Sequence, residues 1–341
     1  MAPASKFRDV LRIVNAHCKM GLTATLVRED DLISNLNFLV GPKLYEANWM
    51  DLTQQGYLAS VQCCEVWCPM TAEFYREYLS DDLTSRVQKL MYILNPNKLR
   101  ACEYLVRVHE ARGDKIIIFS DDIVALTIYC EKLRCPYIYG ATSEDERRVW
   151  LNGFKNRRDV NVIGLSKVGD TALDIPEANV IIQVSSHFGA RRQEAQRLGR
   201  ILRPKASQLA GHMVTGFNAF FYTLVSTDTR EMYFSTKRQQ YLVDQGYTFK
   251  VVQDLIAKAN AESKLLPSKK EELDLLTQAK EADTSADAKE DNAIAASGEY
   301  DTGQISIARR TGAGGATRHT ATLREMSGGT GPTYKEQKSN K

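Results

Sequence analysis

The sequence has no long apolar run and no marked excess of one charge. Hydrophobic residues make up 43% of its 341 residues, but no stretch approaches the roughly eighteen consecutive apolar residues of a membrane-spanning helix. The N-terminus lacks the basic-then-apolar pattern of a secretory signal. We therefore expect a globular, intracellular protein with no membrane partner. The net charge of +3 is too small to indicate nucleic-acid binding by itself, so any basic site must be local.

The sequence also lacks a paired cysteine motif. It has seven cysteines, an odd number, and no two of them form a C-x-x-C pair. Cys64 and Cys68 have a spacing that would suit a metal, but no second pair of Cys or His residues accompanies them. The cysteines are therefore predicted to be reduced thiols in the core, and no metal site is predicted.

Two features of an ATP site are absent. No Gly-Lys dipeptide occurs, so there is no Walker A loop to hold the β- and γ-phosphates. The one Asp-Glu dipeptide, Asp145-Glu146, lies at the start of a polar helix and not after an apolar strand, so it does not suit Mg²⁺. We expect the first half of the nucleotide site to lie elsewhere, and this sequence to be partial.

What the sequence does have is a repeat of short β-branched runs, each followed by a helical pattern, from Lys98 to about Tyr247. This rhythm predicts an α/β fold with a parallel sheet, and ligand-binding loops after the strands. The predicted strands are residues 115–119, 136–139, 160–165, 180–184 and 212–217. Asp121 or Asp122, Ser143 and Gly189 are predicted to begin helices that run to Leu133, to Phe154 and through Arg191–Leu202.

The flanking segments have a different character. Residues 14–25 have the pattern of a strand leading into a loop, and residues 32–67 form a mixed segment that would join two lobes. From about residue 260 the composition shifts to Ala, Lys, Glu, Asp, Ser and Gly. This shift predicts a mostly disordered tail, with a possible helix over residues 269–280.

The most specific motif is QEAQRLGRILR at residues 193–203. Gln196, Arg200 and Arg203 have spacings that share one helix face. Arginines placed in this way can reach the γ-phosphate of a nucleotide across a cleft, as arginine fingers do. The alternative is a basic helix that faces solvent.

A second motif, SKVGDTALDIP at residues 166–176, directly follows a predicted strand. It places hydroxyls, the flexible Gly169 and an acid on one strand-exit loop. Ser166 and Thr171 can bond a DNA phosphate. Asp174 can accept a hydrogen bond from a ribose hydroxyl or orient the arginines, although a helix-capping Asp explains it as well.

Three weaker signals remain. Thr142 can contact a phosphate, although Ser143 as a plain helix cap explains much of that segment. Thr23, Ala24 and Thr25 end an apolar run with two hydroxyls that suit phosphate sensing and its relay to DNA. Arg28, Glu29 and Asp30 form a charge triplet whose plainer explanation is a solvated turn.

Four strings resemble the XPB type of superfamily 2 DNA helicases, the type of the TFIIH helicase subunit. They are GLTATLVREDD at 21–31, GPKLYEANWM at 41–50, SKVGDT at 166–171 and RRQEAQRLGRILR at 191–203. The resemblance covers roughly residues 5–255. It implies the end of a first RecA-like lobe over 1–50, a connector with a thumb-like insertion over 51–95 and a second RecA-like lobe over 96–255. Residues 256–341 would be the mostly disordered tail.

The resemblance also implies roles for the residues above. A catalytic role falls on Gln196, Arg200 and Arg203, and nucleotide binding on Gly169, Asp174, Gly199, Arg200 and Arg203. DNA binding falls on Arg28, Glu29, Asp30, Thr142, Ser166 and Thr171, and coupling between the two sites on Thr23, Ala24 and Thr25. The motif at 166–174 departs from many superfamily members in having Ala172-Leu173 where they carry a Gly before the Asp.

By this resemblance the complete protein would be a nuclear, ATP-driven 3′-to-5′ DNA translocase that opens promoters and damaged DNA. ATP and Mg²⁺ would be held mainly by the first lobe, and the partners would be DNA, that N-terminal lobe and other TFIIH subunits. The alternative is a non-catalytic helicase lobe that docks proteins or DNA. The absent Walker A loop favours this alternative, whereas Arg200 and Arg203 favour a catalytic parent.

Overall fold

The described part of the chain is built on one parallel sheet. The computed structural model describes residues 9–10, 13–22, 37–47, 49–80, 83–167, 178–185, 197–199, 201–202, 216–244 and 247–282. Its strands are β1 (Val61–Cys68), β2 (Ile116–Phe119), β3 (Tyr137–Ile138), β4 (Val162–Leu165), β5 (Val180–Gln183), β6 (Ala219–Ser226) and β7 (Thr248–Val252). All six neighbouring pairs are parallel, in the order β3-β4-β2-β5-β6-β1-β7. The predicted parallel α/β fold is confirmed.

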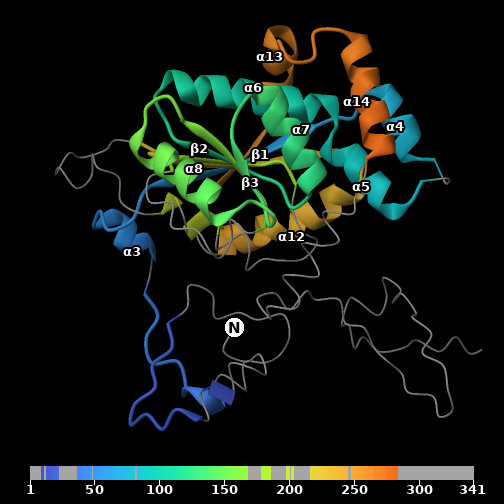
Figure 1. Ribbon diagram of the computed structural model, residues 1–341. Coiled ribbons are helices and arrows are strands. Elements are labelled where there is room, and N and C mark those ends of the chain that lie inside the picture. The colour runs from blue at the N-terminus through green and yellow to red at the C-terminus, as the bar shows by residue number, and fades with distance from the viewer. Residues whose placement is uncertain are drawn as a thin grey trace, which may run out of the picture. The chain divides into compact units, whose positions relative to one another are not determined.

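Helices cover both faces of this sheet. The helices of the described part include α3 (Trp49–Gln54), α4 (Ala72–Tyr78), α5 (Ser85–Ile93), α6 (Pro96–Ala111), α7 (Ile123–Leu133), α8 (Glu144–Asn156), α12 (Arg230–Asp244), α13 (Leu255–Glu262) and α14 (Lys269–Glu281). Alternate residues of β2 face opposite layers: Ile116 and Ile118 pack with α5, α6 and α7, whereas Ile117 and Phe119 pack with α8 and α12. Figure 1 shows α6 and α12 on opposite sides of the sheet.

The central strands are short runs that are buried on both faces. All four residues of β2, of β4 and of β5 are buried, as expected for parallel strands between two helix layers. Gly164 in β4 has a packing reason, since an added Cβ would collide with the Cys130 Sγ of α7. The predictions of strands at 115–119, 136–139, 160–165 and 180–184 are confirmed, with ends that differ by up to two residues.

Two of the predicted helix starts are confirmed with their caps. The Asp122 side chain accepts a hydrogen bond from the Ala125 N–H at 3.0 Å and begins α7. The Ser143 hydroxyl accepts one from the Glu146 N–H at 3.3 Å and begins α8. Gly189 lies outside the described residues. Among the described residues, no helix is both long and apolar enough to cross a membrane.

Two strand predictions are contradicted where the structure describes them. Of the strand predicted at 212–217, residues 212–215 lie outside the described residues, residues 216–217 are irregular, and β6 starts only at Ala219. Gly216 has a φ of 110°. Residues 14–25 were predicted as a strand leading into a loop, and their described part, residues 14–22, contains no strand. Their backbone makes local turns instead, with the Val14 N–H bonded to Val10 O and the Ala16 N–H bonded to Val14 O.

The connector prediction for residues 51–95 was wrong for residues 61–68. These form β1, which lies between β6 and β7 inside the sheet. The strand was hidden because it carries Glu65 in its middle, a charge that is rare in a buried strand. Residues 85–93, assigned by resemblance to a thumb-like insertion, form α5, and Leu90, Met91 and Ile93 of α5 are fully buried.

The tail was predicted to be mostly disordered from about residue 260, with a possible helix at 269–280, and the structure differs from this prediction at residues 260–268. The helix expected at 269–280 is α14, and α13 precedes it. Leu266, Leu275 and Ala279 are at most 1% exposed because they pack against the layer that contains α5 and α6. The low apolar content of this segment misled the prediction, although a few of its apolar residues, including Leu266, Leu275 and Ala279, are buried. Figure 1 shows α13 and α14 on the same side of the sheet as α6.

Candidate functional site

The carboxyl ends of the parallel strands gather polar residues, as predicted. Buried polar side chains leave β2, β4, β5 and β6 at this edge: Ser120, Asp121, Asp122, Ser166, Lys167, Ser185 and Ser226, each at most 7% exposed. Polar groups are rarely buried without partners, because their lost hydration must be replaced. This edge therefore contains fixed hydrogen-bond networks.

The first network is an ion pair between Arg197 and Asp121. The Arg197 side chain is 2% exposed and the Asp121 side chain is fully buried. The guanidinium Nη2 donates to the Asp121 Oδ1, and its carbon lies 4.8 Å from the centre of the Phe119 ring. Charge and ring together hold the guanidinium in one plane. This pair fastens the helical residues 197–199 and 201 to the end of β2.

Asp121 is itself held in place by its neighbours. The Asp121 N–H donates to the Ser185 Oγ at 2.7 Å, and that oxygen lies 3.1 Å from the Ser120 Oγ. The Ser120 hydroxyl also donates to the Asp122 carbonyl at 2.8 Å. The exits of the adjacent strands β2 and β5 are thus joined by side chains as well as by the sheet ladder.

A second buried ion pair joins Lys98 of α6 and Glu231 of α12. The Lys98 Nζ donates to Glu231 Oε2 at 2.6 Å and to the Val184 carbonyl at 3.0 Å. The Ser226 N–H donates to the same carboxylate at 2.8 Å. Both charged side chains are at most 4% exposed. This pair ties the helices of the two faces together across the ends of β5 and β6.

The thiol of Cys68 lies beside this second pair. Burial raises the pKa of the Cys68 thiol to about 12, and the nearby Lys98 charge lowers it only in part. Cys64 on the same strand has its pKa raised to about 11, also mainly by burial. These thiols stay protonated at neutral pH. In the described part of the chain, no group of three or more His, Cys, Asp or Glu side chains is arranged to hold a metal ion.

Three of the predicted site residues are described. Ser166 is fully buried, and its N–H donates to the Ile138 carbonyl at 3.0 Å. Thr142 is 8% exposed, and its hydroxyl oxygen accepts a hydrogen bond from the Tyr139 N–H at 3.0 Å within its own turn. Gly199 is exposed, and an added Cβ there would meet open space among the described atoms. Roles for these residues in DNA or nucleotide binding stay predictions.

The other predicted site residues lie outside the described residues. They are Thr23, Ala24, Thr25, Arg28, Glu29, Asp30, Gly169, Thr171, Asp174, Gln196, Arg200 and Arg203.

The sequence reasoning missed the Arg197 and Asp121 pair. A signal for each partner was present. Asp121 is the acid beside Asp122, so only one of the two was needed as a helix cap. Arg197 stands four residues before Ile201, on the face of its helix that carries buried Leu198. An arginine on an apolar face indicates a buried acidic partner.

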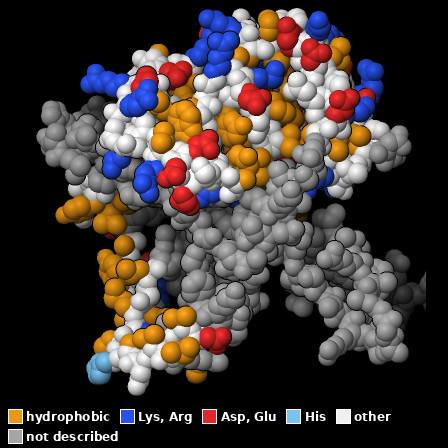
Figure 2. All heavy atoms as spheres, in the orientation of Figure 1, with side chains coloured by type: hydrophobic (Ala, Val, Ile, Leu, Met, Phe, Trp, Pro, Cys, Tyr) orange, Lys and Arg blue, Asp and Glu red, His pale blue; other side chains and the backbone are white. Residues whose placement is uncertain are grey.

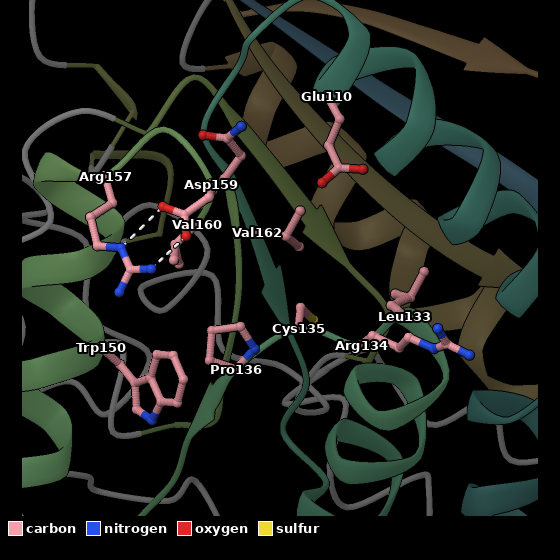
Figure 3. Close-up of a pocket in the computed structure, with 11 residues that line it drawn as sticks. Glu110, Leu133, Arg134, Cys135, Pro136, Trp150, Arg157, Asp159, Val160 and Val162 are labelled. Carbon is pink, nitrogen blue, oxygen red and sulfur yellow. Dashed lines mark hydrogen bonds and ion pairs between the residues drawn. The ribbon is translucent and has the colours of Figure 1, made fainter.

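A hollow of about 550 Å³ lies at the other edge of the sheet (Figure 3). Its walls come from the amino ends of β3 and β4 and the ends of α6 and α7, and they include Cys135, Pro136, Val160 and Val162. No predicted site residue lines it. On the face of the body drawn in Figure 2, Lys and Arg side chains lie among Asp and Glu side chains, so charge of neither sign dominates there.

Comparison with known proteins identifies the family. The sequence model of the ERCC3/RAD25/XPB C-terminal helicase family matches residues 52–306. The XPB1 helicase/translocase subunit of general transcription and DNA repair factor IIH from Arabidopsis thaliana is 60% identical over 280 residues, which are 81% of this chain and 36% of that protein. The XPB subunit of the same factor from Danio rerio is 52% identical over 334 residues, 98% of this chain and 40% of that protein.

Among solved structures, Saccharomyces cerevisiae Dbp5 bound to RNA and ADP BeF3 has a TM-score of 0.47 at 14% identity, covering 70% of this chain and 53% of that one. The family of this chain follows from the sequence matches and not from this structural likeness. The chain spans only 36–40% of the length of the two relatives named. Because the family match covers most of the sequence, the chain belongs to the ERCC3/RAD25/XPB C-terminal helicase family.

Proposed function

We propose that this chain is the second motor lobe, preceded by the end of the first, of an ATP-driven DNA helicase and translocase that moves 3′ to 5′. It would act within factor IIH, in the nucleus, in promoter opening and DNA repair. The support is the family membership together with the names of the relatives, which are helicase/translocase subunits of a transcription and DNA repair factor. The other subunits of that factor, DNA and the first lobe are its proposed partners.

The observation that carries this proposal is the orientation of the helix around residue 199. Arg197, Leu198 and Ile201 are buried against the sheet, whereas Gly199 is exposed. Positions 196, 200 and 203 lie outside the described residues, and Leu202 is not helical. At about 3.6 residues per turn, a helix continued through this segment would place positions 196 and 200 on the side away from the buried face. We propose that Gln196, Arg200 and Arg203 face a cleft toward the first lobe.

One observation on the described residues is compatible with a nucleotide nearby. Among the described atoms, none lies within 4 Å of a Cβ added at the exposed Gly199. Bound ATP with Mg²⁺ supplies the phosphoanhydride bond whose hydrolysis drives movement. Arg200 and Arg203 would donate to oxygens that gain charge as the terminal phosphoryl group leaves. Gly169 and Asp174 would complete the nucleotide contact from this lobe.

DNA would be held by phosphate contacts without sequence preference. Ser166 and Thr171 follow β4, and Thr142 follows β3, so the adjacent strands β3 and β4 bring these segments to one part of the carboxyl edge. Arg28, Glu29 and Asp30 would help to separate the strands. Thr23, Ala24 and Thr25 would relay the nucleotide state between the two sites.

The test requires the upstream lobe. The full chain would be joined to the residues that precede the matched region in the Arabidopsis thaliana relative, and DNA-stimulated ATP hydrolysis measured. Arg200→Ala and Arg203→Ala should each lower kcat by about 10³-fold or more, with little change in ATP affinity, because a finger acts on the transition state. Lysine should rescue neither position, since a point charge cannot replace the planar fork.

Arg158→Ala is the matched control, because Arg158 is an exposed arginine on the loop between α8 and β4. It should leave kcat unchanged. If both finger variants instead kept near-normal kcat, the proposed motor function would be abandoned in favour of a docking module.

A further inference from the structure

We propose that Asp121 is a positioning residue for the arginine fingers and acts through Arg197. Its role would be to fix the rotation and depth of the helical residues 197–199 and 201, and through them the position of the segment that contains Arg200 and Arg203. This inference rests on the proposed function, because it concerns the geometry of that same site. It assigns a task to a buried ion pair that neither the family match nor the resemblance supplies.

Asp121 is held in a fixed position at the end of β2. Asp121 directly follows β2, a strand whose four residues are all buried. Its backbone N–H is bonded to Ser185 at the end of the neighbouring strand β5. The next residue, Asp122, is fixed as the cap of α7. The carboxylate therefore has little freedom to move relative to the sheet.

The contact from Arg197 restricts the orientation of its helix as well as its position. Arg197 approaches from 76 residues further along the chain and donates to Asp121 while its guanidinium lies over the Phe119 ring. Leu198 and Ile201 on the same helix enter the apolar layer with Phe119 and Phe154. Apolar packing alone tolerates small sliding and rotation, whereas a planar guanidinium between an acid and a ring permits one arrangement.

Arg197 is close in the sequence to both proposed arginine fingers. Arg197 precedes Arg200 by three residues and Arg203 by six. A rotation of the helical residues 197–199 and 201 would displace the neighbouring Arg200 and the start of the chain that leads to Arg203. Displacements of about 1 Å at a reacting group can cost about 10²-fold in rate. The ion pair is thus placed where a small loss of precision has a large effect on turnover.

The other buried ion pair lacks this relation to the fingers. Lys98 and Glu231 join α6 to α12, and neither helix carries a proposed catalytic residue. A buried ion pair is also weak evidence of added stability, since apolar residues of similar volume often serve as well. Arg197, by contrast, lies three residues before Arg200 in the sequence. This proximity favours a role for the Asp121 and Arg197 pair in positioning the arginine fingers.

The principal variant is Arg197→Lys in the joined protein described above. It keeps a buried positive charge near Asp121 but loses the planar fork and the stacking on Phe119. We expect kcat to fall about 10-fold or more, with ATP affinity within about twofold of the parent. Arg100→Lys is the matched control, because Arg100 also pairs with an acid, Glu272, at 12% side-chain exposure but lies in the α6 and α14 layer. It should lower the melting temperature without lowering kcat.

The deciding measurement is a mutant cycle of Arg197→Lys with the double variant Arg200→Ala and Arg203→Ala. If Asp121 and Arg197 act through the fingers, Arg197→Lys should add less than about a twofold loss of kcat once both fingers are removed. If the two losses multiply instead, Arg197 acts independently and the inference is wrong. A normal kcat for Arg197→Lys beside a slow Arg200→Ala would likewise overturn this inference alone. A normal kcat for Arg200→Ala would overturn the proposed function and this inference with it.

A second variant guards against a folding defect. Removing one partner of a buried pair leaves a stranded charge, so Asp121→Asn is expected to melt at a lower temperature. The double variant Asp121→Leu with Arg197→Met removes both charges and should restore the melting temperature. We expect that it remains slow, with a kcat at least about 10-fold below that of the parent. A stable double variant with the parent's kcat would show that the polar tie is unnecessary.

Discussion

The seven cysteines differ in exposure, and this difference decides their chemistry. Cys18 is exposed, Cys135 is partly exposed, and the remaining five are buried. The thiolate is the reactive form of cysteine. Since burial raises the pKa of Cys64 to about 11 and that of Cys68 to about 12, these thiols combine poor access with a very small thiolate fraction at pH 8.

Alkylation should therefore be strongly selective in the folded chain. With iodoacetamide at pH 8, Cys18 should react first and Cys135 more slowly, and the five buried thiols should react only after a denaturant is added. Peptide mass spectrometry of timed samples would measure this order. A Cys18→Ser variant should lose the fast phase. Rapid labelling of Cys64 or Cys68 in the native protein would contradict the buried positions of both.

Sequence reasoning at this scale succeeded for local contacts and failed for distant ones. Asp122 and Ser143 were predictable as caps because each bonds a backbone N–H three residues away. The pairing of Asp121 with Arg197 spans 76 residues, and no local pattern fixes which acid an arginine on an apolar face will meet. The same holds for Glu65, whose carboxylate receives the Trp67 indole N–H at 2.7 Å and the hydroxyl of the distant Ser235.

At the scale of elements, α13 and α14 form a clamp along α6, α5 and α4. The turn between them is held by Glu103 of α6, whose carboxylate accepts from the Ser263 hydroxyl at 2.8 Å and from two backbone N–H groups, those of Lys264 at 2.9 Å and Leu265 at 3.3 Å. Ion pairs of Lys269 with Glu73 and of Lys280 with Glu77 join α14 to α4. These two ion pairs are partly exposed and contribute little. The clamp therefore depends mainly on Glu103, on Arg100, which pairs with Glu272 and donates to the Leu266 carbonyl at 3.0 Å, and on the buried leucines.

Glu103→Ala should release this clamp. The loss of three acceptor contacts, two of them to backbone donors, should destabilise the clamp by about 2–4 kcal/mol. Trypsin should then cut at Lys264 and Lys269 faster than in the parent, at a rate measured by gel electrophoresis. Glu110→Ala, an exposed glutamate on the same helix, is the control and should leave the rate unchanged. Equal cleavage of both variants would show that Glu103 does not hold the turn.

The elements that could be predicted are those whose burial is uniform. β2, β4 and β5 are apolar on both faces, so their runs stand out from the flanking polar residues. β1 and β7 were missed because β1 contains Glu65 and β7 is only half-buried. Of the clamp, α14 was expected as a possible helix, whereas the turn between α13 and α14 was taken as part of a disordered tail, because its contacts with α6 are not visible in the composition.

At the scale of the whole molecule, the sequence predicts that this chain depends on another lobe for catalysis. The purified chain should show negligible ATP hydrolysis with or without DNA, because it has no Gly-Lys dipeptide for a Walker A loop. A phosphate-release assay at saturating ATP would measure this, with the Arg200→Ala chain as the background. DNA-stimulated turnover above that background would contradict the prediction.

The place of β1 in the sheet has a consequence for how the chain is made. Its two neighbours, β6 and β7, are both synthesised after it. The contact from Ser60 to Asn218 beside β1 spans 158 residues. At about 5–20 residues per second, a ribosome needs roughly eight to thirty seconds to cover that length. During this interval β1 has no neighbouring strand to pair with. Unpaired strands with apolar side chains aggregate readily. Nascent chains halted before residue 219 should therefore be the form that depends most on chaperones.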